Sequence, residues 1–242
     1  MSRKSRRNEA TRNPPPPSPA QSRGGIGRGT IFAIAGAVLV LLFVSAVLAY
    51  RSTQAEAARQ SAAKNAAHLA SAHAPLLGKP DAMVHIVEFL DPACETCAAF
   101  YPHVKKLMAD NPGRIRLSIR HVPFHEGSEH VVRILEAARG QDRYWETLEA
   151  VFANQDRWTV NHRVYPERVW PALEGIGLDL ERARRDMNAA DIAARIEKDT
   201  TDAKALNVTK TPEYFVNGRP MPRFGLEELQ GLVKEELRSA YR

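Results

Sequence analysis

The sequence predicts an α/β domain with a helical block inserted in its middle, preceded by a single N-terminal transmembrane helix. Residues 31–50 carry no charge, and these twenty residues, at about 1.5 Å each, match a hydrocarbon core of about 30 Å. A strand-like apolar run at 84–90 precedes a Cys-x-x-Cys pair, and a helical run follows the pair. The predicted regions are a tail (1–29), a transmembrane anchor (30–50), a spacer (51–74) and the α/β domain (75–242), with its helical insert at about 127–207.

The basic character of the chain is confined to the tail. Residues 1–28 carry seven basic residues against one acid, Glu9, and this net charge of +6 equals that of the whole chain. The remainder is neutral, so the basic composition gives no reason to expect a nucleic acid partner. A run of four prolines and a glycine-rich stretch cannot bury a core, so we expect a disordered or extended tail.

The apolar segment has two interpretations. We prefer an uncleaved anchor, and the positive-inside rule then places the tail in the cytoplasm and the residues after Arg51 outside. The alternative is a cleaved signal peptide, because residues 47–49 resemble a cleavage site. The apolar run, however, is longer than the usual central region of a signal peptide, about 7–15 residues.

The alanine- and glutamine-rich spacer is predicted to be helical, because its residues have high helix propensity. It could act as a simple spacer or as a coiled-coil stalk that brings copies of the chain together. The segment lacks large apolar residues at the core positions of a heptad repeat, which argues against a strong coiled coil.

The first half of the α/β domain reads strand, helix, strand. A strand is predicted at 85–90, and a helix at 94–110 carries apolar residues at helical spacing. Pro102 is expected to kink this helix, because proline removes one backbone hydrogen bond. A second strand is predicted at 115–122, where apolar and polar residues alternate.

The second half of the domain is predicted to be mostly helical. Residues 128–207 should form successive helices, one ended by Gly140 and one capped by Asp179. Asn217-Gly218 is a strong signal for a type I′ turn between two strands. The remaining predicted elements are helix starts at Pro166 or Pro171, a break at Gly177, strands at 213–216 and 219–223, a closing helix at 226–241, and core positions for Trp145, Trp158 and Trp170.

Cys94 and Cys97 are the only cysteines of the chain. Cys94 lies at the predicted strand-to-helix turn, where the free N–H groups of the first helical turn stabilise a thiolate, the attacking species of thiol–disulfide exchange. We therefore predict a redox-active pair, with Cys94 as the more exposed nucleophile and Cys97, one turn deeper, as the resolving thiol. The alternatives are inert thiols, a structural disulfide whose four-residue loop would stabilise little, and a zinc site without enough ligands.

Three histidines lie at or soon after the end of the second predicted strand. His121, His125 and His130 span a strand end, a turn and a helix start, so we do not expect them to converge on a metal ion. The sequence accordingly predicts no metal site and no cofactor.

The order of these motifs resembles the DsbA-like thioredoxin family of extracytoplasmic thiol–disulfide oxidoreductases. The resemblance covers residues 76–242 and implies a thioredoxin fold with an inserted helical domain. It is carried by Leu77-Gly78-Lys79-Pro80-Asp81-Ala82, Val87-Glu88-Phe89-Leu90-Asp91, the cysteine pair, Val122-Pro123-Phe124-His125, residues 145–155, Val208-Thr209-Lys210-Thr211-Pro212 and Tyr214-Phe215-Val216-Asn217-Gly218.

The resemblance implies roles for three further residues. Pro212 is expected to follow a cis peptide bond beside the cysteine pair, and the main chain of Thr211 is expected to pair with an extended substrate segment. Glu88 is expected to be a buried acid that relays a proton to or from the resolving thiol. A solvent-exposed carboxylate at the sheet edge is the alternative for Glu88.

The dipeptide between the cysteines departs from the strongest oxidases of that family, which carry Pro-His there. In this chain Glu95 places a negative charge next to Cys94, which opposes formation of the thiolate. A strongly oxidising potential is therefore in doubt on sequence grounds.

The leading functional hypothesis is a disulfide oxidase anchored in the bacterial cytoplasmic membrane, with its catalytic domain in the periplasm or extracytoplasmic space. Its partners would be exported cysteine-containing proteins and a membrane redox partner that resets the Cys-x-x-Cys pair. One alternative is a reductase or isomerase supplied by a membrane electron donor. The other is a noncatalytic thioredoxin-like adaptor.

Overall fold

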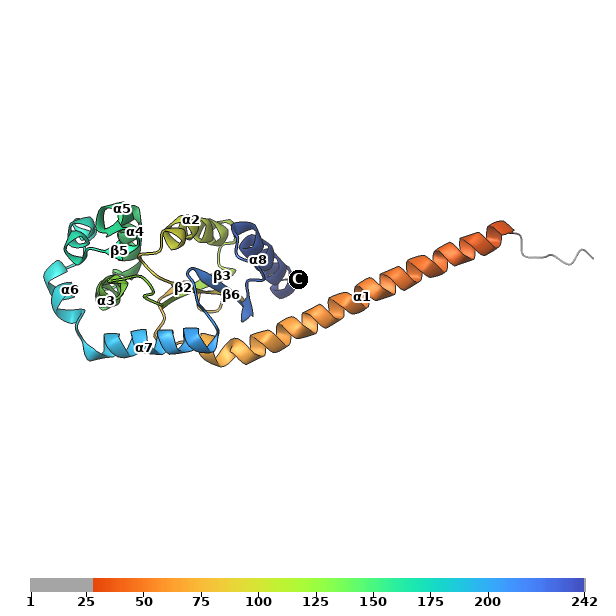
Figure 1. Ribbon diagram of the computed structural model, residues 1–242, viewed down its shortest axis with the longest axis horizontal. Coiled ribbons are helices and arrows are strands. Elements are labelled where there is room, and N and C mark those ends of the chain that lie inside the picture. The colour runs from red at the N-terminus through yellow and green to blue at the C-terminus, as the bar shows by residue number, and fades with distance from the viewer. Residues whose placement is uncertain (1–27, 242) are drawn as a thin grey trace, which may run out of the picture. The chain divides into compact units, whose positions relative to one another are not determined.

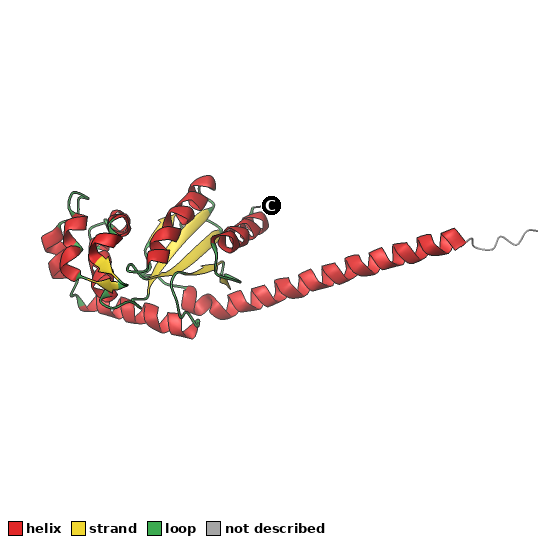
Figure 2. Ribbon diagram, turned by 45° about the horizontal axis from the view of Figure 1, so that its top comes forward, coloured by secondary structure: helices red, strands yellow, loops and turns green. Residues whose placement is uncertain are grey.

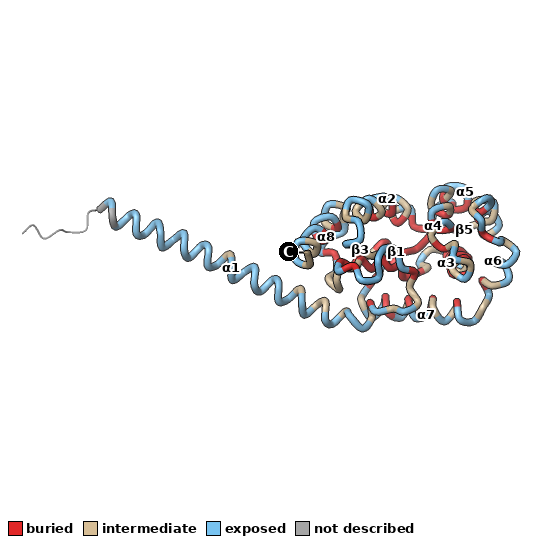
Figure 3. Tube along the Cα trace, turned by 180° about the vertical axis from the view of Figure 1, so that it is seen from behind, coloured by how far each residue is buried: buried red, intermediate tan, exposed pale blue. Residues whose placement is uncertain are grey.

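The computed structural model describes residues 28–241 and divides the chain into two units, Met1–Ser52 and Thr53–Arg242. The expected disorder of the tail therefore falls almost wholly outside the described residues. Helix α1 (Arg28–Leu69) includes the predicted anchor and most of the predicted spacer. From Ile31 onward it is long and apolar enough to cross a membrane, and the large apolar side chains of this part are exposed (Figure 3). Helix α1 is thus a candidate membrane span.

The second unit is built on a five-stranded sheet with the order β1-β3-β2-β6-β7 (Figure 2). Strands β2 and β3 are parallel, and the other neighbouring pairs are antiparallel. The strands are β1 (Leu76–Gly78), β2 (Val84–Leu90), β3 (Ile115–His121), β6 (Glu213–Val216) and β7 (Arg219–Pro220). Strand β1 was not predicted, because three residues are too few to show an alternating pattern.

Both faces of the sheet are covered, which explains why nearly every residue of β2 and β3 is buried. Helices α2 (Glu95–Asp110) and α8 (Leu226–Ala240) pack on one face, against residues such as Ile86 and Leu117. The C-terminal end of α1 and helix α7 (Ala190–Ala205) cover the other, against Val87 and Phe89 (Figure 1). Consecutive residues of β2 therefore serve two different cores.

The insert forms its own apolar core beside the sheet (Figure 1). Gly140 ends α3 (Ser128–Arg139) as predicted, and the Asp179 side chain caps α6 (Leu180–Asp186) by accepting a 2.9 Å hydrogen bond from the Arg182 N–H. The other α-helices are α4 (Tyr144–Ala153) and α5 (Gln155–Trp158), and the short 3₁₀ helices are η1 (Pro166–Arg168) and η2 (Trp170–Leu173).

Two predictions for the insert are corrected. It is not wholly helical, because β4 (Thr159–Val160) and β5 (Arg163–Val164) form a small hairpin that is too short to leave a pattern in the sequence. Among the tryptophans, Trp158 is fully buried, whereas Trp145 and Trp170 are only half-buried at the margins of the two cores.

The C-terminal hairpin closes the fold as predicted. Asn217 and Gly218 have φ angles of 48° and 83°, as a type I′ turn requires. Glycine is needed here for a second reason: a β-carbon on Gly218 would lie 3.0 Å from Ala62 of α1. The return strand β7 ends at Pro220 rather than at residue 223, and helix α8 follows.

Candidate functional site

Cys94 is the N-cap of helix α2. The strand β2 ends at Leu90, and a short turn brings the chain to Cys94, whose N–H donates to the Asp91 carbonyl (3.0 Å) and whose carbonyl accepts from the Ala98 N–H (3.2 Å). Both cysteines are free thiols; Cys94 is 5% exposed and Cys97 is fully buried. The more exposed thiol is thus Cys94, as its place at the helix start predicted.

The surroundings of the Cys94 sulfur favour the thiolate. A hydrogen bond from the Cys97 thiol, together with contacts to Thr211 and to the backbone N–H groups of Thr96 and Cys97, outweighs desolvation and lowers the Cys94 pKa to about 5. In the protonated form, the Cys94 thiol donates to the Thr211 carbonyl (3.3 Å). The thiol therefore lies at a helix N-terminus that stabilises its charged form.

Cys97 is in the opposite state. Burial raises its pKa well above the ordinary value, and its hydrogen bond to Cys94 and the nearby charges of Glu88 and Cys94 raise it further. At neutral pH Cys97 is a thiol. Any reaction that releases Cys97 from a disulfide must therefore supply it with a proton.

Glu88 is fully buried, on the same face of β2 as Ile86 and Leu90, which pack in one core with both cysteines, and it is close enough to both thiols for their charges to interact. Among residues 28–241, neither of its carboxyl oxygens makes a hydrogen bond of normal geometry, and neither does the hydroxyl of Tyr214, its register partner on β6. Burial raises the Glu88 pKa to about 8; the nearby Tyr214 hydroxyl offsets part of this rise, and the charge of Cys94 adds to it. Glu88 is thus not the exposed edge carboxylate that the sequence left open, and it carries a proton at neutral pH.

Thr211 and Pro212 come from the far end of the sequence to the same site. The peptide bond between them is cis, as the resemblance implied. The Thr211 carbonyl contacts the Cys94 sulfur directly, so the main chain of this segment lies beside the nucleophile. The structure therefore brings Cys94, Cys97, Glu88 and Thr211-Pro212 together.

Sequence reasoning missed a buried carboxylate that holds the turn before Cys94. Asp91 is fully buried and accepts hydrogen bonds from the Ala93 N–H (2.9 Å), the His125 N–H (2.9 Å), the His125 ring nitrogen Nδ1 (2.7 Å) and the Ser128 hydroxyl. Asp91 thereby ties this turn to the loop after β3. The sequence feature that could have indicated this role is an acidic residue, Asp91, directly after the apolar run at 84–90.

The three histidines do not converge. The His121 ring contacts the Tyr144 hydroxyl (3.0 Å), His125 binds Asp91, and His130 lies edge-on to Trp170. Each ring therefore has its own partner on a different element, as their spacing predicted.

The Glu95 carboxylate pairs with a residue of the insert. Its Oε2 atom lies 2.7 Å from Nδ1 of His162, in the turn between β4 and β5. The expectation that Glu95 would oppose the Cys94 thiolate was made without this partner.

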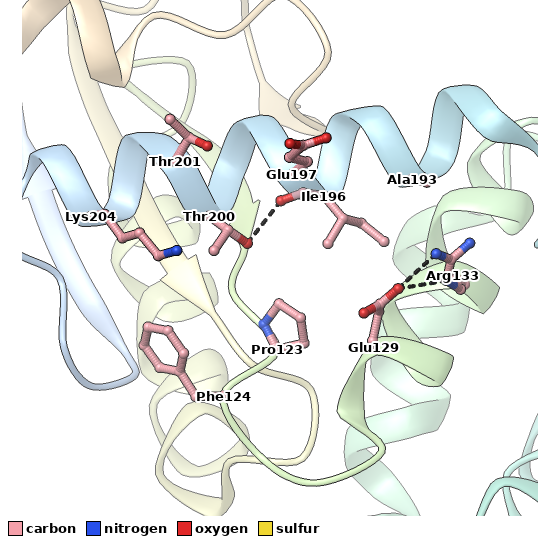
Figure 4. Close-up of a pocket in the computed structure, with 10 residues that line it drawn as sticks. All are labelled: Pro123, Phe124, Glu129, Arg133, Ala193, Ile196, Glu197, Thr200, Thr201 and Lys204. Atoms are coloured by element: carbon pink, nitrogen blue, oxygen red, sulfur yellow. Dashed lines mark hydrogen bonds and ion pairs between the residues drawn. The ribbon is translucent and has the colours of Figure 1, made fainter.

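A separate open pocket of about 460 Å³ lies between the loop after β3, helix α3 and helix α7 (Figure 4). Its lining includes the half-exposed Phe124 ring and the Glu129–Arg133 ion pair. None of the five predicted site residues lines this pocket, so the cysteine site and the pocket are distinct features.

Comparisons with known proteins agree with this geometry. A thioredoxin family profile matches residues 70–235. Disulfide bond formation protein D of Bacillus subtilis is 28% identical over 178 residues, which cover 68% of this chain and 77% of that protein. A Na(+)/H(+) antiporter, NhaA of Herminiimonas arsenicoxydans, is 32% identical over 142 residues, which are 59% of this chain but only 22% of the antiporter.

Solved structures extend the comparison to the fold. A thioredoxin-like oxidoreductase from Silicibacter pomeroyi superposes with a TM-score of 0.61 at 29% identity, covering 70% of this chain and 95% of that one. The predicted thioredoxin fold with a helical insertion is confirmed, and so is the resemblance to thiol–disulfide oxidoreductases.

Proposed function

The chain belongs to the thioredoxin family, and from that premise we propose that it exchanges disulfides with cysteines of exported proteins through Cys94 and Cys97. The observation that carries the proposal is the opposite state of the two thiols. Cys94 has a lowered pKa at a helix N-terminus, and Cys97 is buried with a raised one. Similarity to a disulfide bond formation protein supports it.

In the oxidising direction the cycle begins with a disulfide between the two cysteines. A substrate thiolate attacks the Cys94 sulfur, the Cys94–Cys97 bond breaks, and a substrate–Cys94 mixed disulfide forms. A second substrate thiolate then attacks the substrate sulfur and releases Cys94 as a thiolate. Two electrons pass from the substrate, which gains a disulfide, to the enzyme, which becomes a dithiol.

Glu88 supplies the proton that this cycle requires. Cys97 leaves as a thiolate in a buried site, where its charged form is strongly disfavoured. Glu88 is protonated at neutral pH and is close enough to Cys97 for their charges to interact, so it can transfer its proton to Cys97. In the reverse direction the Glu88 carboxylate accepts the proton from Cys97.

The low Cys94 pKa favours the oxidase direction over the reductase or isomerase alternative. A thiolate that is stabilised at neutral pH stabilises the reduced enzyme, which makes its disulfide the stronger oxidant. A measured redox equilibrium with glutathione decides between the two directions: an oxidase gives a potential nearer to about −120 mV, and a reductase nearer to about −270 mV.

The proposed partners and location follow from helix α1. An uncleaved membrane anchor with residues after Arg51 on the extracytoplasmic side would place the domain among exported, cysteine-containing substrates. A membrane redox partner would then remove two electrons from the reduced cysteines after each cycle. The thioredoxin-like site would use the Thr211 main chain to pair with an extended substrate segment.

The division of labour between the cysteines gives the test. Cys97→Ala should accumulate mixed disulfides with exported proteins, visible on a nonreducing gel and released by reductant. The Cys94 thiolate still attacks substrate disulfides, and the thiol that attacks the mixed disulfide in the reverse direction, Cys97, is gone. Cys94→Ala should accumulate few, because the remaining thiol is buried and protonated. Equal trapping by both variants overturns the assignment of nucleophile and resolver. No trapping by either, with unchanged biological function, favours the noncatalytic adaptor.

A further inference from the structure

The turn between β4 and β5 has an unusual backbone. Asn161 and His162 have φ angles of 51° and 61°, in the left-handed region. Two-residue hairpin turns of this kind favour asparagine followed by glycine, and a histidine in the second position is strained. The His162 side chain, 63% exposed, is therefore presented from a turn whose backbone conformation is costly for a non-glycine residue.

That side chain reaches the dipeptide between the cysteines. His162 Nδ1 lies 2.7 Å from the Oε2 atom of Glu95, the residue directly after Cys94. The His162 ring also stacks on the His125 ring, with centroids 5.3 Å apart and planes 26° apart.

The stacked rings connect both sides of Cys94. His125 binds Asp91, and Asp91 accepts from the N–H of Ala93, the residue before Cys94. His162 binds Glu95, the residue after it. Two carboxylate–imidazole pairs, stacked through their rings, thus hold the chain before and after the nucleophile.

Glu95 is the group whose charge matters most here. A free carboxylate in the first turn of α2 would disfavour a negative sulfur next to it. In the structure this carboxylate lies 2.7 Å from an imidazole nitrogen of the insert, and the Cys94 pKa is lowered to about 5. The carboxylate that the sequence places beside the nucleophile therefore has a partner in the insert.

We propose that His162 is a positioning residue of the redox site, which holds the Glu95 carboxylate so that its charge does not oppose the Cys94 thiolate. The inserted domain then sets the reactivity of the nucleophile through one turn residue. This inference rests on the proposed role of Cys94 as the attacking thiol. Both partners are more than half exposed, at 63% and 52%, so the effect should be modest.

The test measures the Cys94 thiolate without any protein substrate. The reduced full-length protein is alkylated with iodoacetamide between pH 4 and 8, and the rate of single labelling is followed by intact mass. His162→Gly suits the φ of 61° and removes the imidazole without adding backbone strain. It should slow labelling below the titration midpoint by about two- to five-fold.

Three further variants separate positioning from a general structural effect. His162→Asn keeps an N–H donor at the place of Nδ1 and tolerates the left-handed backbone, so it should label at close to the wild-type rate. The Glu95→Gln, His162→Gly double variant should label at the rate of Glu95→Gln alone. Arg163 lies on the same hairpin, and Arg163→Ala, which removes an exposed ion pair with Glu126, should leave the labelling rate unchanged.

Two outcomes overturn the proposal: His162→Gly labels like the wild type, or the double variant is slowed as much as His162→Gly. Failure of the proposed function looks different. If Cys97→Ala traps no substrate while His162→Gly still slows labelling in a Glu95-dependent way, disulfide exchange is refuted and the positioning role stands.

Discussion

Glu88 and the aspartates of helix α7 are carboxyl groups buried on opposite faces of one sheet, and their states differ. Within the part of the chain that the structure describes, the Glu88 carboxyl makes no hydrogen bond of normal geometry; the nearby Tyr214 hydroxyl lowers its pKa only in part, and burial raises that pKa to about 8. Asp199 and Asp202 contact Arg120, and Asp202 has a pKa of about 2. Arg120 lies opposite Phe89 in the register, one residue along β2 from Glu88. Consecutive residues of a strand lie on opposite faces of the sheet, so Glu88 on one face and Arg120 on the other meet different partners.

The aspartate side is a cluster in which each buried carboxylate has a charged partner. We call it the Arg120 cluster: Arg120, Asp199, Asp202, His68 and His73. Arg120 Nη2 lies 2.5 Å from Asp202, its Nε atom donates to Asp199, and its Nη1 atom donates to the His68 carbonyl at 2.9 Å. The His73 ring nitrogen Nε2 lies 2.7 Å from Asp199.

Burial by itself raises the pKa of both aspartates. The hydrogen bonds of His73 and Arg120 to Asp199, and those of Lys198 and Arg120 to Asp202, more than reverse that effect. Hydrogen-bonding and charged partners therefore decide whether a buried carboxyl group is charged. The partnered carboxylates link the end of α1 to α7 and β3, whereas the unpartnered acid is left free to exchange its proton.

The largest expected effect comes from removing the cation of the cluster. Arg120→Met leaves two buried aspartates without their shared partner, and breaking a buried ion pair in this way costs about 3–5 kcal/mol of unfolding free energy. Urea denaturation of the purified protein at pH 7 measures the loss. A change below about 1 kcal/mol would show that Lys198 and the histidines alone satisfy the aspartates.

The next effect is a pH dependence that belongs to Glu88. Its pKa is raised from 4.5 in the unfolded chain to about 8 in the folded one, so the folded protein binds the proton more tightly. The resulting stability is fully present below pH 4.5 and is lost as the pH rises through 8. We expect this contribution, measured as the difference in unfolding free energy between the wild type and Glu88→Gln, to fall by about 2–4 kcal/mol over this window. Cys94 and His85, whose pKa values are lowered, contribute slopes of the opposite sign that both proteins share.

Glu88→Gln provides the control, because glutamine cannot titrate while Cys94 and His85 still do, so the difference between the two profiles isolates the Glu88 contribution. The Arg120 cluster responds at acidic pH instead. Because the Asp202 pKa is about 2, the contribution of Asp202 to stability is lost only when strong acid protonates its carboxylate. Equal slopes for wild type and Glu88→Gln would contradict the raised pKa.

A kinetic effect of the same substitution follows from the proposed proton transfer. Glu88→Gln should slow each step in which Cys97 gains or loses a proton, by about tenfold, while leaving alkylation of Cys94 nearly unchanged. Stopped-flow measurement of exchange with a model dithiol from pH 5 to 8 tests this. Rates equal to those of the wild type across that range would remove Glu88 from the mechanism.

The sequence predicted one side of the comparison better than the other. Glu88 and Cys94 are six residues apart, and the alternation of β2 places Glu88 on the same covered face as Ile86 and Leu90. The proximity of Glu88 and Cys94 can therefore be predicted from the local sequence. Arg120, by contrast, reaches partners 79 and 82 residues away. The alternation of β3 assigns Arg120 a face but does not reveal which helix will cover it.

The same limit explains the missed contact at the redox site. The Glu95 side chain was noticed as a charge next to Cys94, but its partner lies in a hairpin of two-residue strands. Asn161-His162 lacks the glycine that marks such a turn, so a helix was the default prediction for this region. Close pairing across an insertion depends on tertiary packing, which local patterns do not record.

The smallest predicted effect compares the two histidines that contact the Arg120 cluster. His73 is 23% exposed and lies 2.7 Å from Asp199, whereas His68 is 43% exposed and lies 3.1 Å from Asp202. Each contributes one hydrogen bond to a carboxylate that keeps other partners, so each alanine variant should lose about 0.5–1.5 kcal/mol. His73→Ala should lose more than His68→Ala, because its hydrogen bond is shorter and less hydrated. Urea denaturation at pH 7.5 measures both losses. A larger loss for His68→Ala would mean that attachment of the end of α1 through His68, rather than burial of the hydrogen bond, sets the strength of the contact.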